Sequence, residues 1–170
     1  MPTTPPLQRR ALTAMLIALI GGGALLTAGC GKVEADRGQI AKDLGLAYGA
    51  YTTYVTGPTD AGKLGPSTSP SSSVAKQAAA ASHYATRAVE AARTEAAPDN
   101  ALASFAQKTA AAGASLNAVS QVLTTGRASR SIVDGGQASL DSLLAAARDI
   151  GLKVETQRVA AGDLDSPPVP

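Results

Sequence analysis

The amino-acid sequence predicts an all-α protein, an antiparallel four-helix bundle with a flexible linker after the first helix and a disordered C-terminal tail. Alanine, which has the highest intrinsic helix propensity, supplies 36 of the 170 residues. Only 3% of the residues are aromatic, which disfavours a β-sandwich or an α/β enzyme. Four segments of about 20 residues also repeat apolar residues at spacings of three and four, the period of one helix face.

The first 29 residues have the features of an export signal. Arg9 and Arg10 precede a charge-free run over residues 11–29 that ends at Cys30, the only cysteine of the chain. The length of this run is close to the ~20 residues of a membrane-spanning helix, but three consecutive glycines at 21–23 weaken such a helix. Retention as an uncleaved anchor and simple secretion are the alternatives to cleavage before Cys30. All three place the following domain outside the cytoplasm.

The end of the apolar run, Leu26-Thr27-Ala28-Gly29-Cys30, resembles the lipobox of bacterial lipoproteins. This resemblance implies that residues 1–29 are removed, that Cys30 is diacylated, and that the protein is held on the outer face of the cytoplasmic membrane. The chain departs from the lipobox at Thr27, where leucine is usual. Lipidation also accounts for an unpaired cysteine, which cannot form an internal disulfide.

After a lipidated tether at residues 30–33, the bundle domain is predicted to span residues 34–153. Its first helix covers residues 34–56 and ends at Gly57-Pro58. Residues 57–73 are rich in Gly, Pro, Ser and Thr and lack periodicity, which predicts the flexible linker. The apolar face of the first helix consists of Ile40, Leu44, Ala47, Tyr51 and Tyr54.

The second helix is predicted from residue 74 to about residue 97, with Ser72 or Ser73 as its N-cap and Pro98 directly after its end. Nearly all of its apolar face is small, so helix axes can approach closely there. The first helix is expected to supply the bulk that this face lacks. The face consists of Ala78, Ala81, Ala85, Ala88 and Ala92, with Tyr84 and Val89 beside it.

The third and fourth helices carry the larger core residues. Asp99 or Asn100 caps the third helix, Gly126 closes it, and residues 127–131 form a short connection. Gly151 and Leu152 are placed to end the fourth helix in a Schellman motif. Residues 154–170 are predicted to be a disordered tail. The inward positions are Leu102, Phe105, Thr109, Ala112, Leu116, Val119 and Leu123 in the third helix, and Ile132, Gly136, Leu140, Leu143, Ala147 and Ile150 in the fourth.

The residues that most catalytic and metal sites need are scarce. His83 is the only histidine, and Ala80 stands where a Glu-x-x-His metal motif needs glutamate, so we expect no metal, no cofactor and no enzymatic activity. Removal of Arg9 and Arg10 lowers the 15 basic residues to 13, equal to the 13 acidic ones, which argues against nucleic-acid binding. A solvated charged face is expected for Glu34, Asp36, Asp43, Asp134, Asp141 and Asp149.

Two patterns in the first helix stand out. Tyr48, Tyr51 and Tyr54 follow one another at spacings of three, which indicates either core filling over the alanine face or, with Pro58, an interaction surface. Gly45 and Gly49 have the G-x-x-x-G spacing, which indicates close packing against another helix or a dimerisation motif. A carrier that binds a small molecule or peptide between the first two helices is the alternative function. It requires an apolar pocket of at least ~300 Å³ that reaches the tyrosines.

The stretch Tyr51-x-x-Tyr54-Val55-x-x-Pro58-x-x-Ala61-Gly62-Lys63-Leu64 resembles one shared by small exported, lipid-anchored helical proteins of actinobacteria. The resemblance implies an extracytoplasmic location and a helical fold, and it carries over no activity and no catalytic residue. The sequence therefore predicts a cell-envelope lipoprotein with a non-catalytic binding or structural role. Its partners would be the membrane, through Cys30, and an envelope protein or a small ligand.

Overall fold

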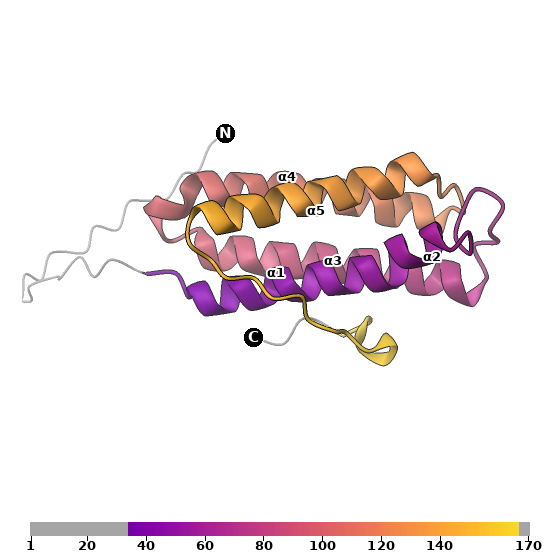
Figure 1. Ribbon diagram of the computed structural model, residues 1–170, viewed down its shortest axis with the longest axis horizontal. Helices are drawn as coiled ribbons and strands as arrows, with labels where there is room; N and C mark the ends of the chain where they lie inside the picture. The colour runs from indigo at the N-terminus through magenta and orange to yellow at the C-terminus, as the bar shows by residue number, and fades with distance from the viewer. Residues whose placement is uncertain (1–33, 167–170) are drawn as a thin grey trace, which may run out of the picture. The chain divides into compact units, whose positions relative to one another are not determined.

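The computed structural model describes residues 34–166, in which all the regular secondary structure is helical and there is no strand. The predicted export signal, its alternatives and Cys30 lie outside the described residues. Among residues 34–166, no helix has both the length and the apolar character that crossing a membrane requires. In Figure 1 the four long helices lie side by side, and α3 packs against α1 and α4 while α4 packs against α5. These helices are α1 (Arg37–Tyr51), α3 (Ser73–Ala96), α4 (Ala103–Thr124) and α5 (Arg130–Asp149).

The helix ends follow the predicted signals. The side chains of Ser72 and Asp99 accept hydrogen bonds from backbone N–H groups in the first turns that follow them, at 3.2 and 2.9 Å. Gly151, with φ of +82°, ends α5 in the left-handed conformation that glycine adopts without strain. Its N–H donates to the carbonyl of Arg148, and the N–H of Leu152 donates to that of Ala147, which is the predicted Schellman motif.

The core combines the alanine face of α3 with larger side chains from its neighbours. All seven positions predicted for the α3 face are buried. Ser82 donates to the carbonyl of Leu116 at 3.0 Å, so this buried hydroxyl between α3 and α4 is satisfied. Of the larger residues predicted to face inward from α4 and α5, Ile132 and Ile150 are only partly buried, and both pack against the core. The others are buried, namely Leu102, Phe105, Leu116, Val119, Leu123, Leu140 and Leu143.

The first helix does not stop at Gly57-Pro58 as predicted. A π-helical turn, Thr52–Thr56, joins α1 to the short helix α2 (Gly57–Asp60). Pro58 is tolerated because a first-turn residue needs no N–H for an intrahelical bond. The extra residue of the π-turn rotates the chain that follows, so Val55 and Thr59 face inward while Pro58 is only half-buried.

The predicted linker over residues 57–73 is largely folded, which corrects the expectation of a flexible segment. Leu64 is buried, and its N–H and that of Lys63 both donate to the carbonyl of Pro58. A Cβ atom on Gly126, at the end of α4, would overlap the ring of Pro70. Turn hydrogen bonds and one apolar anchor thus order a segment whose composition alone indicates flexibility.

The predicted disordered tail is wrong for residues 154–166. Residues 152–166, here called the C-terminal strap, run in an extended path across α1 and end in a 3₁₀ turn, Ala161–Asp163 (Figure 1). Leu152, Val159 and Leu164 are buried, each at 5% exposure or less. The expectation of disorder failed because these three apolar residues are too widely spaced to show helical or strand periodicity, yet each reaches a neighbouring helix.

Candidate functional site

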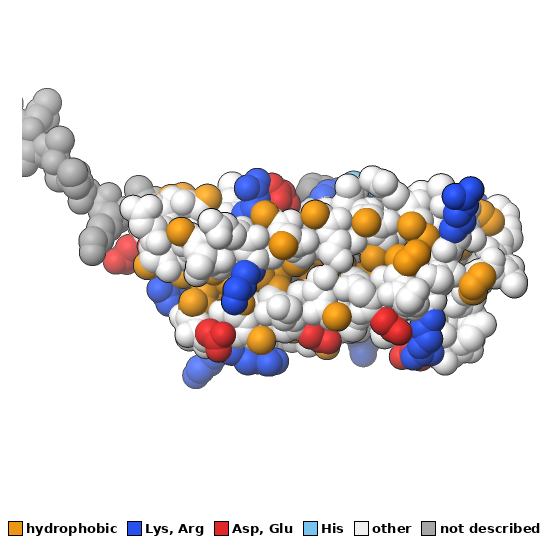
Figure 2. Space-filling view, turned by 90° about the horizontal axis from the view of Figure 1, so that it is seen from above, with side chains coloured by type: hydrophobic (Ala, Val, Ile, Leu, Met, Phe, Trp, Pro, Cys, Tyr) orange, Lys and Arg blue, Asp and Glu red, His pale blue; other side chains and the backbone are white. Residues whose placement is uncertain are grey.

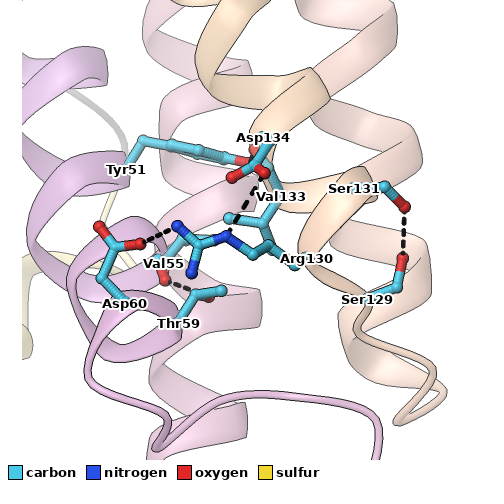
Figure 3. A network of polar contacts seen from close by, with 9 residues as sticks. All are labelled: Tyr51, Val55, Thr59, Asp60, Ser129, Arg130, Ser131, Val133 and Asp134. Atoms are coloured by element: carbon cyan, nitrogen blue, oxygen red, sulfur yellow. Dashed lines mark hydrogen bonds and ion pairs between the residues drawn. The ribbon is translucent and has the colours of Figure 1, made fainter.

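Tyr48, Tyr51 and Tyr54, expected either to fill the core or to form an interaction surface, each contact a different part of the molecule. Tyr51 is completely buried, and its hydroxyl donates to the carbonyl of Val133 on α5 at 2.8 Å (Figure 3). Gly136 makes room for it, because a Cβ atom there would lie 2.8 Å from the Tyr51 ring carbon Cζ. Burial, with the nearby Asp134 carboxylate, raises the pKa of the Tyr51 phenol. Tyr51 is therefore a core residue and belongs to no exposed surface.

Tyr48 remains the tyrosine nearest to the predicted interaction surface. It is half-buried, and its phenol pKa is raised by burial and by the Asp141 carboxylate of α5. Pro58 is also half-buried, and its carbonyl accepts from the N–H groups of Lys63 and Leu64 at 2.8 and 3.1 Å. The backbone oxygen of Pro58 is thus already used within the turn.

Tyr54 faces the C-terminal strap, because its hydroxyl donates to the carbonyl of Val159 at 2.9 Å. The structure therefore places Tyr48 beside α5, Tyr51 in the core and Tyr54 against the strap. They do not form a continuous aromatic stripe.

Close to Tyr51, an exposed ion-pair cluster joins α2 to α5 (Figure 3). The Arg130 guanidinium contacts the carboxylates of Asp60 at 2.7 Å and Asp134 at 3.6 Å. All three side chains are more than half exposed, and exposed pairs of this kind contribute at most ~1 kcal/mol each. The cluster orients α2 against α5 and leaves no group poised for chemistry.

Among the described residues, those nearest to the G-x-x-x-G pair of α1 belong to the C-terminal strap and not to a second helix. A Cβ atom on Gly45 would overlap the carbonyl oxygen of Glu155, and one on Gly49 would overlap that of Gln157. The N–H of Gln157 donates to the carbonyl of Gly45 at 3.1 Å. The absence of two side chains therefore creates a shallow groove into which the backbone of an extended chain fits.

Arg87 of α3 holds the far end of the strap. Its guanidinium donates to the carbonyls of Leu164 and Ser166 at 2.9 Å, and to that of Asp165 at 3.5 Å. The Arg87 guanidinium also lies 5.8 Å from the centroid of the Tyr84 ring, within cation–π range. The Nε–H of Arg87 is buried and has no partner in the described part of the chain.

Asp43 of α1 is a buried carboxylic acid, which corrects the expectation that it belongs to a solvated face. It is only 1% exposed, and one carboxyl oxygen accepts from the Gln39 amide at 2.9 Å while the other has no hydrogen-bond partner within residues 34–166. Burial raises the pKa of Asp43 to about 6, and the bond from Gln39 and the charge of Lys42 only partly offset this. Repulsion from Glu95 raises this pKa further.

Hollows lie between neighbouring elements on the surface of residues 34–166, and no tyrosine lines the three described here. One of about 310 Å³ lies between α4 and α5, beside Lys108 and Ser139. Another of about 340 Å³ lies between α3 and α4, beside Arg87 and Asn117. The third, of about 220 Å³, lies between α1 and the strap. The first two reach the size that a carrier needs, but they lie away from the tyrosines.

The rest of the described surface was searched for metal ligands and for areas of one charge. His83 is exposed, and the described residues hold no group of three His, Cys, Asp or Glu side chains that could share a metal ion. On the face shown in Figure 2, Lys and Arg side chains are interspersed with Asp and Glu, and apolar side chains lie between them. No large area of one sign of charge appears on that face.

Sequence reasoning missed two features, the buried Asp43 and the groove that holds the strap. The available signals were the glycine pair on α1 and the isolated aliphatic residues Val159 and Leu164 after the last helix. Comparison of the chain with protein-family models, with curated proteins and with solved structures finds no match.

Proposed function

We propose that this protein is a cell-envelope lipoprotein, held by diacylated Cys30 on the outer face of the cytoplasmic membrane, with a non-catalytic binding or structural role. The observation that carries the proposal is the apolar run that ends in Ala28-Gly29-Cys30 directly before the helical unit. Two acyl chains make a stable anchor, whereas one holds a protein only marginally. Six residues separate Cys30 from Arg37, where α1 begins, and they span at most ~20 Å.

The proposed architecture for this role is an antiparallel four-helix bundle. It is supported by the packing of α3 on both α1 and α4, by that of α4 on α5, and by the short connections at residues 97–99 and 125–129. Such a bundle presents long, rigid faces near the membrane. The surface around Tyr48 and Pro58 is the proposed contact for an envelope partner, because half-buried aromatic residues are effective interface anchors.

The anchor is tested by metabolic labelling with an alkyne-tagged fatty acid. The wild type should incorporate the label and migrate as the processed form, whereas Cys30→Ala should do neither. Lys32→Ala keeps the cysteine and should behave as wild type. Normal processing of Cys30→Ala together with an unlabelled wild type would exclude a lipoprotein.

The binding role is tested by cross-linking intact cells and purifying the anchored protein with its neighbours. Tyr48→Ala should reduce recovery of the cross-linked partner at least tenfold while the melting temperature changes little, because Tyr48 is only half-buried. Gln107→Ala, on an exposed position of α4, is the matched control. Equal recovery with Tyr48→Ala would exclude the Tyr48 surface.

A further inference from the structure

The hollow between α3 and α4 is mostly apolar. Its volume of about 340 Å³ lies at the small end of the range for ligand pockets. Ala110, Gly113 and Ala114 line it from α4 and carry nothing larger than a methyl group. The hollow therefore has room for a small organic molecule with an apolar body.

Gly113 enlarges this hollow without serving the packing of the helices. It lies within α4, where glycine lowers helix stability relative to alanine. A Cβ atom on Gly113 would lie 3.8 Å from Cγ1 of Val89, which is an ordinary van der Waals contact. At Gly45, Gly49 and Gly136, by contrast, a Cβ atom would overlap a neighbour. The space beside Gly113 is thus one that a methyl group could fill and that the described chain leaves open.

Arg87 lines the same hollow from α3 and has an unused donor. Its terminal nitrogens donate to the carbonyls of Leu164 and Ser166, which hold the guanidinium in place. Its Nε–H is buried and has no partner among residues 34–166. An unsatisfied buried donor is destabilising, so an acceptor atom beside Arg87 would stabilise the protein.

The charge of the hollow favours an anion. Glu90 and Arg93 also line it, but they form an ion pair with each other and are about half exposed. Within the described residues no ion pair includes Arg87, whose guanidinium contacts carbonyl oxygens. One uncompensated positive charge beside an apolar surface matches a monoanion, and a carboxylate accepts strong, charge-assisted hydrogen bonds from a guanidinium.

We propose that the hollow between α3 and α4 binds a small monocarboxylate with an apolar body. The carboxylate contacts Arg87 and supplies the acceptor that its Nε–H lacks, and the apolar body lies over Gly113. This site gives the binding role proposed above a class of ligand, and it rests on that role.

The test uses the full chain in phosphatidylcholine nanodiscs, with phenylacetate and hexanoate as probes and saturation-transfer NMR as the measurement. Empty nanodiscs give the background. Each carboxylate should bind about tenfold more tightly than its neutral amide, phenylacetamide or hexanamide, which has nearly the same shape but no charge. Gly113→Ala should weaken the binding of both carboxylates about tenfold, because its methyl group occupies the hollow. Gly135→Ala is the matched control, since it also replaces a helical glycine but lies outside the hollow.

The role of Arg87 is tested by the preference for a carboxylate over its amide. Arg87→Gln should remove this preference, because the uncompensated charge is lost. Arg87→Gln also loosens the strap, so Tyr54→Phe is the control. It removes another hydrogen bond to the strap, does not line the hollow, and should keep the preference.

Three outcomes would overturn the proposal. They are the absence of binding of both carboxylates, equal binding of carboxylate and amide to the wild type, and undiminished binding by Gly113→Ala. Lipid labelling of Cys30 is a separate measurement, so failure of the carboxylate site and failure of the lipoprotein assignment are distinguishable.

Discussion

Two interfaces of the molecule bury apolar side chains, one between α3 and α4 and one between α1 and the C-terminal strap. Side-chain packing holds the first together, whereas backbone contacts fix the position of the second. Between α3 and α4, alanines at helical spacing meet larger residues such as Phe105 and Leu116. Between α1 and the strap, Gly45 and Gly49 have no side chains, so the strap backbone lies directly against α1. A hydrogen bond from the N–H of Gln157 to the carbonyl of Gly45 holds it there. The buried residues of both interfaces belong to one core cluster, but the first interface joins two long helices, whereas the second joins a helix to a segment that is mostly outside helices. We therefore expect equally buried residues to contribute differently to stability in the two interfaces.

The largest expected effect is at Phe105 in the helical core. Phe105 is 2% exposed, and its replacement by Ala would leave a cavity in the helical core. This replacement should lower the free energy of unfolding by about 3 kcal/mol or more, because apolar burial is lost and the cavity is not refilled. Denaturant titration followed by circular dichroism measures this loss. The exposed Lys108→Ala on the same helix should change stability by less than about 0.5 kcal/mol. A loss below that value for Phe105→Ala would refute the helical core described here.

Asp43 tests whether the helical interface tolerates charge. Its folded pKa of about 6 lies above the ordinary value of 3.8, so the stability that the protonated form contributes is complete below pH 3.8 and is lost as the pH rises through 6. Asp43→Asn should therefore stabilise the protein at pH 7 by about 2 to 3 kcal/mol and bring little gain at pH 4. Thermal unfolding between pH 4 and pH 8 measures this difference. The exposed Asp149→Asn is the control, and a gain that does not depend on pH would contradict the assignment.

Two adjacent glycines of α5 separate packing from helix propensity. A Cβ atom on Gly136 would overlap the Tyr51 hydroxyl, so Gly136→Ala should destabilise the protein by about 1 to 3 kcal/mol. Gly135 has open space at the corresponding point, and Gly135→Ala should stabilise it by about 0.5 to 1 kcal/mol. Urea midpoints of the two variants check both values. Changes of the same sign would show that Tyr51 does not occupy the space beside Gly136.

The smallest expected effect is at Leu164 in the strap, although it is as buried as Phe105, at 2% exposure. Leu164→Ala should lower the global free energy of unfolding by no more than about 1 kcal/mol, because the weakened strap detaches while the helices stay packed. Amide exchange at Gln157 should accelerate in the same variant. A global loss equal to that of Phe105→Ala would mean that the strap is an inseparable part of the core.

The two regions also differ in how well the sequence predicts them. All seven positions that helical spacing predicted for the α3 face are buried, as are the large residues predicted for α4, because periodicity records which side chains face inward. In α5 the spacing identified Leu140 and Leu143 but missed the buried Val133 and Leu144. The strap interface depends on backbone atoms and on the missing side chains of Gly45 and Gly49, which leave no periodic signal. For the three tyrosines of the first helix, the sequence showed that aromatic residues are concentrated there, but it did not show which part of the molecule each one contacts. The partner of Tyr54 is a carbonyl 105 positions away.

These separations along the chain determine when each interface can form. Tyr54 and Val159 of the strap are bonded across 105 positions, whereas Ser82 and Leu116 are bonded across 34 and Ser115 and Ser139 across only 24. Closing a longer loop costs more conformational entropy, and contacts between distant residues form late in folding. We therefore expect the pairs α3–α4 and α4–α5 to assemble first and the strap to dock last. In that order of folding, the backbone of α1 at Gly45 and Gly49 is exposed to water until the strap docks on it.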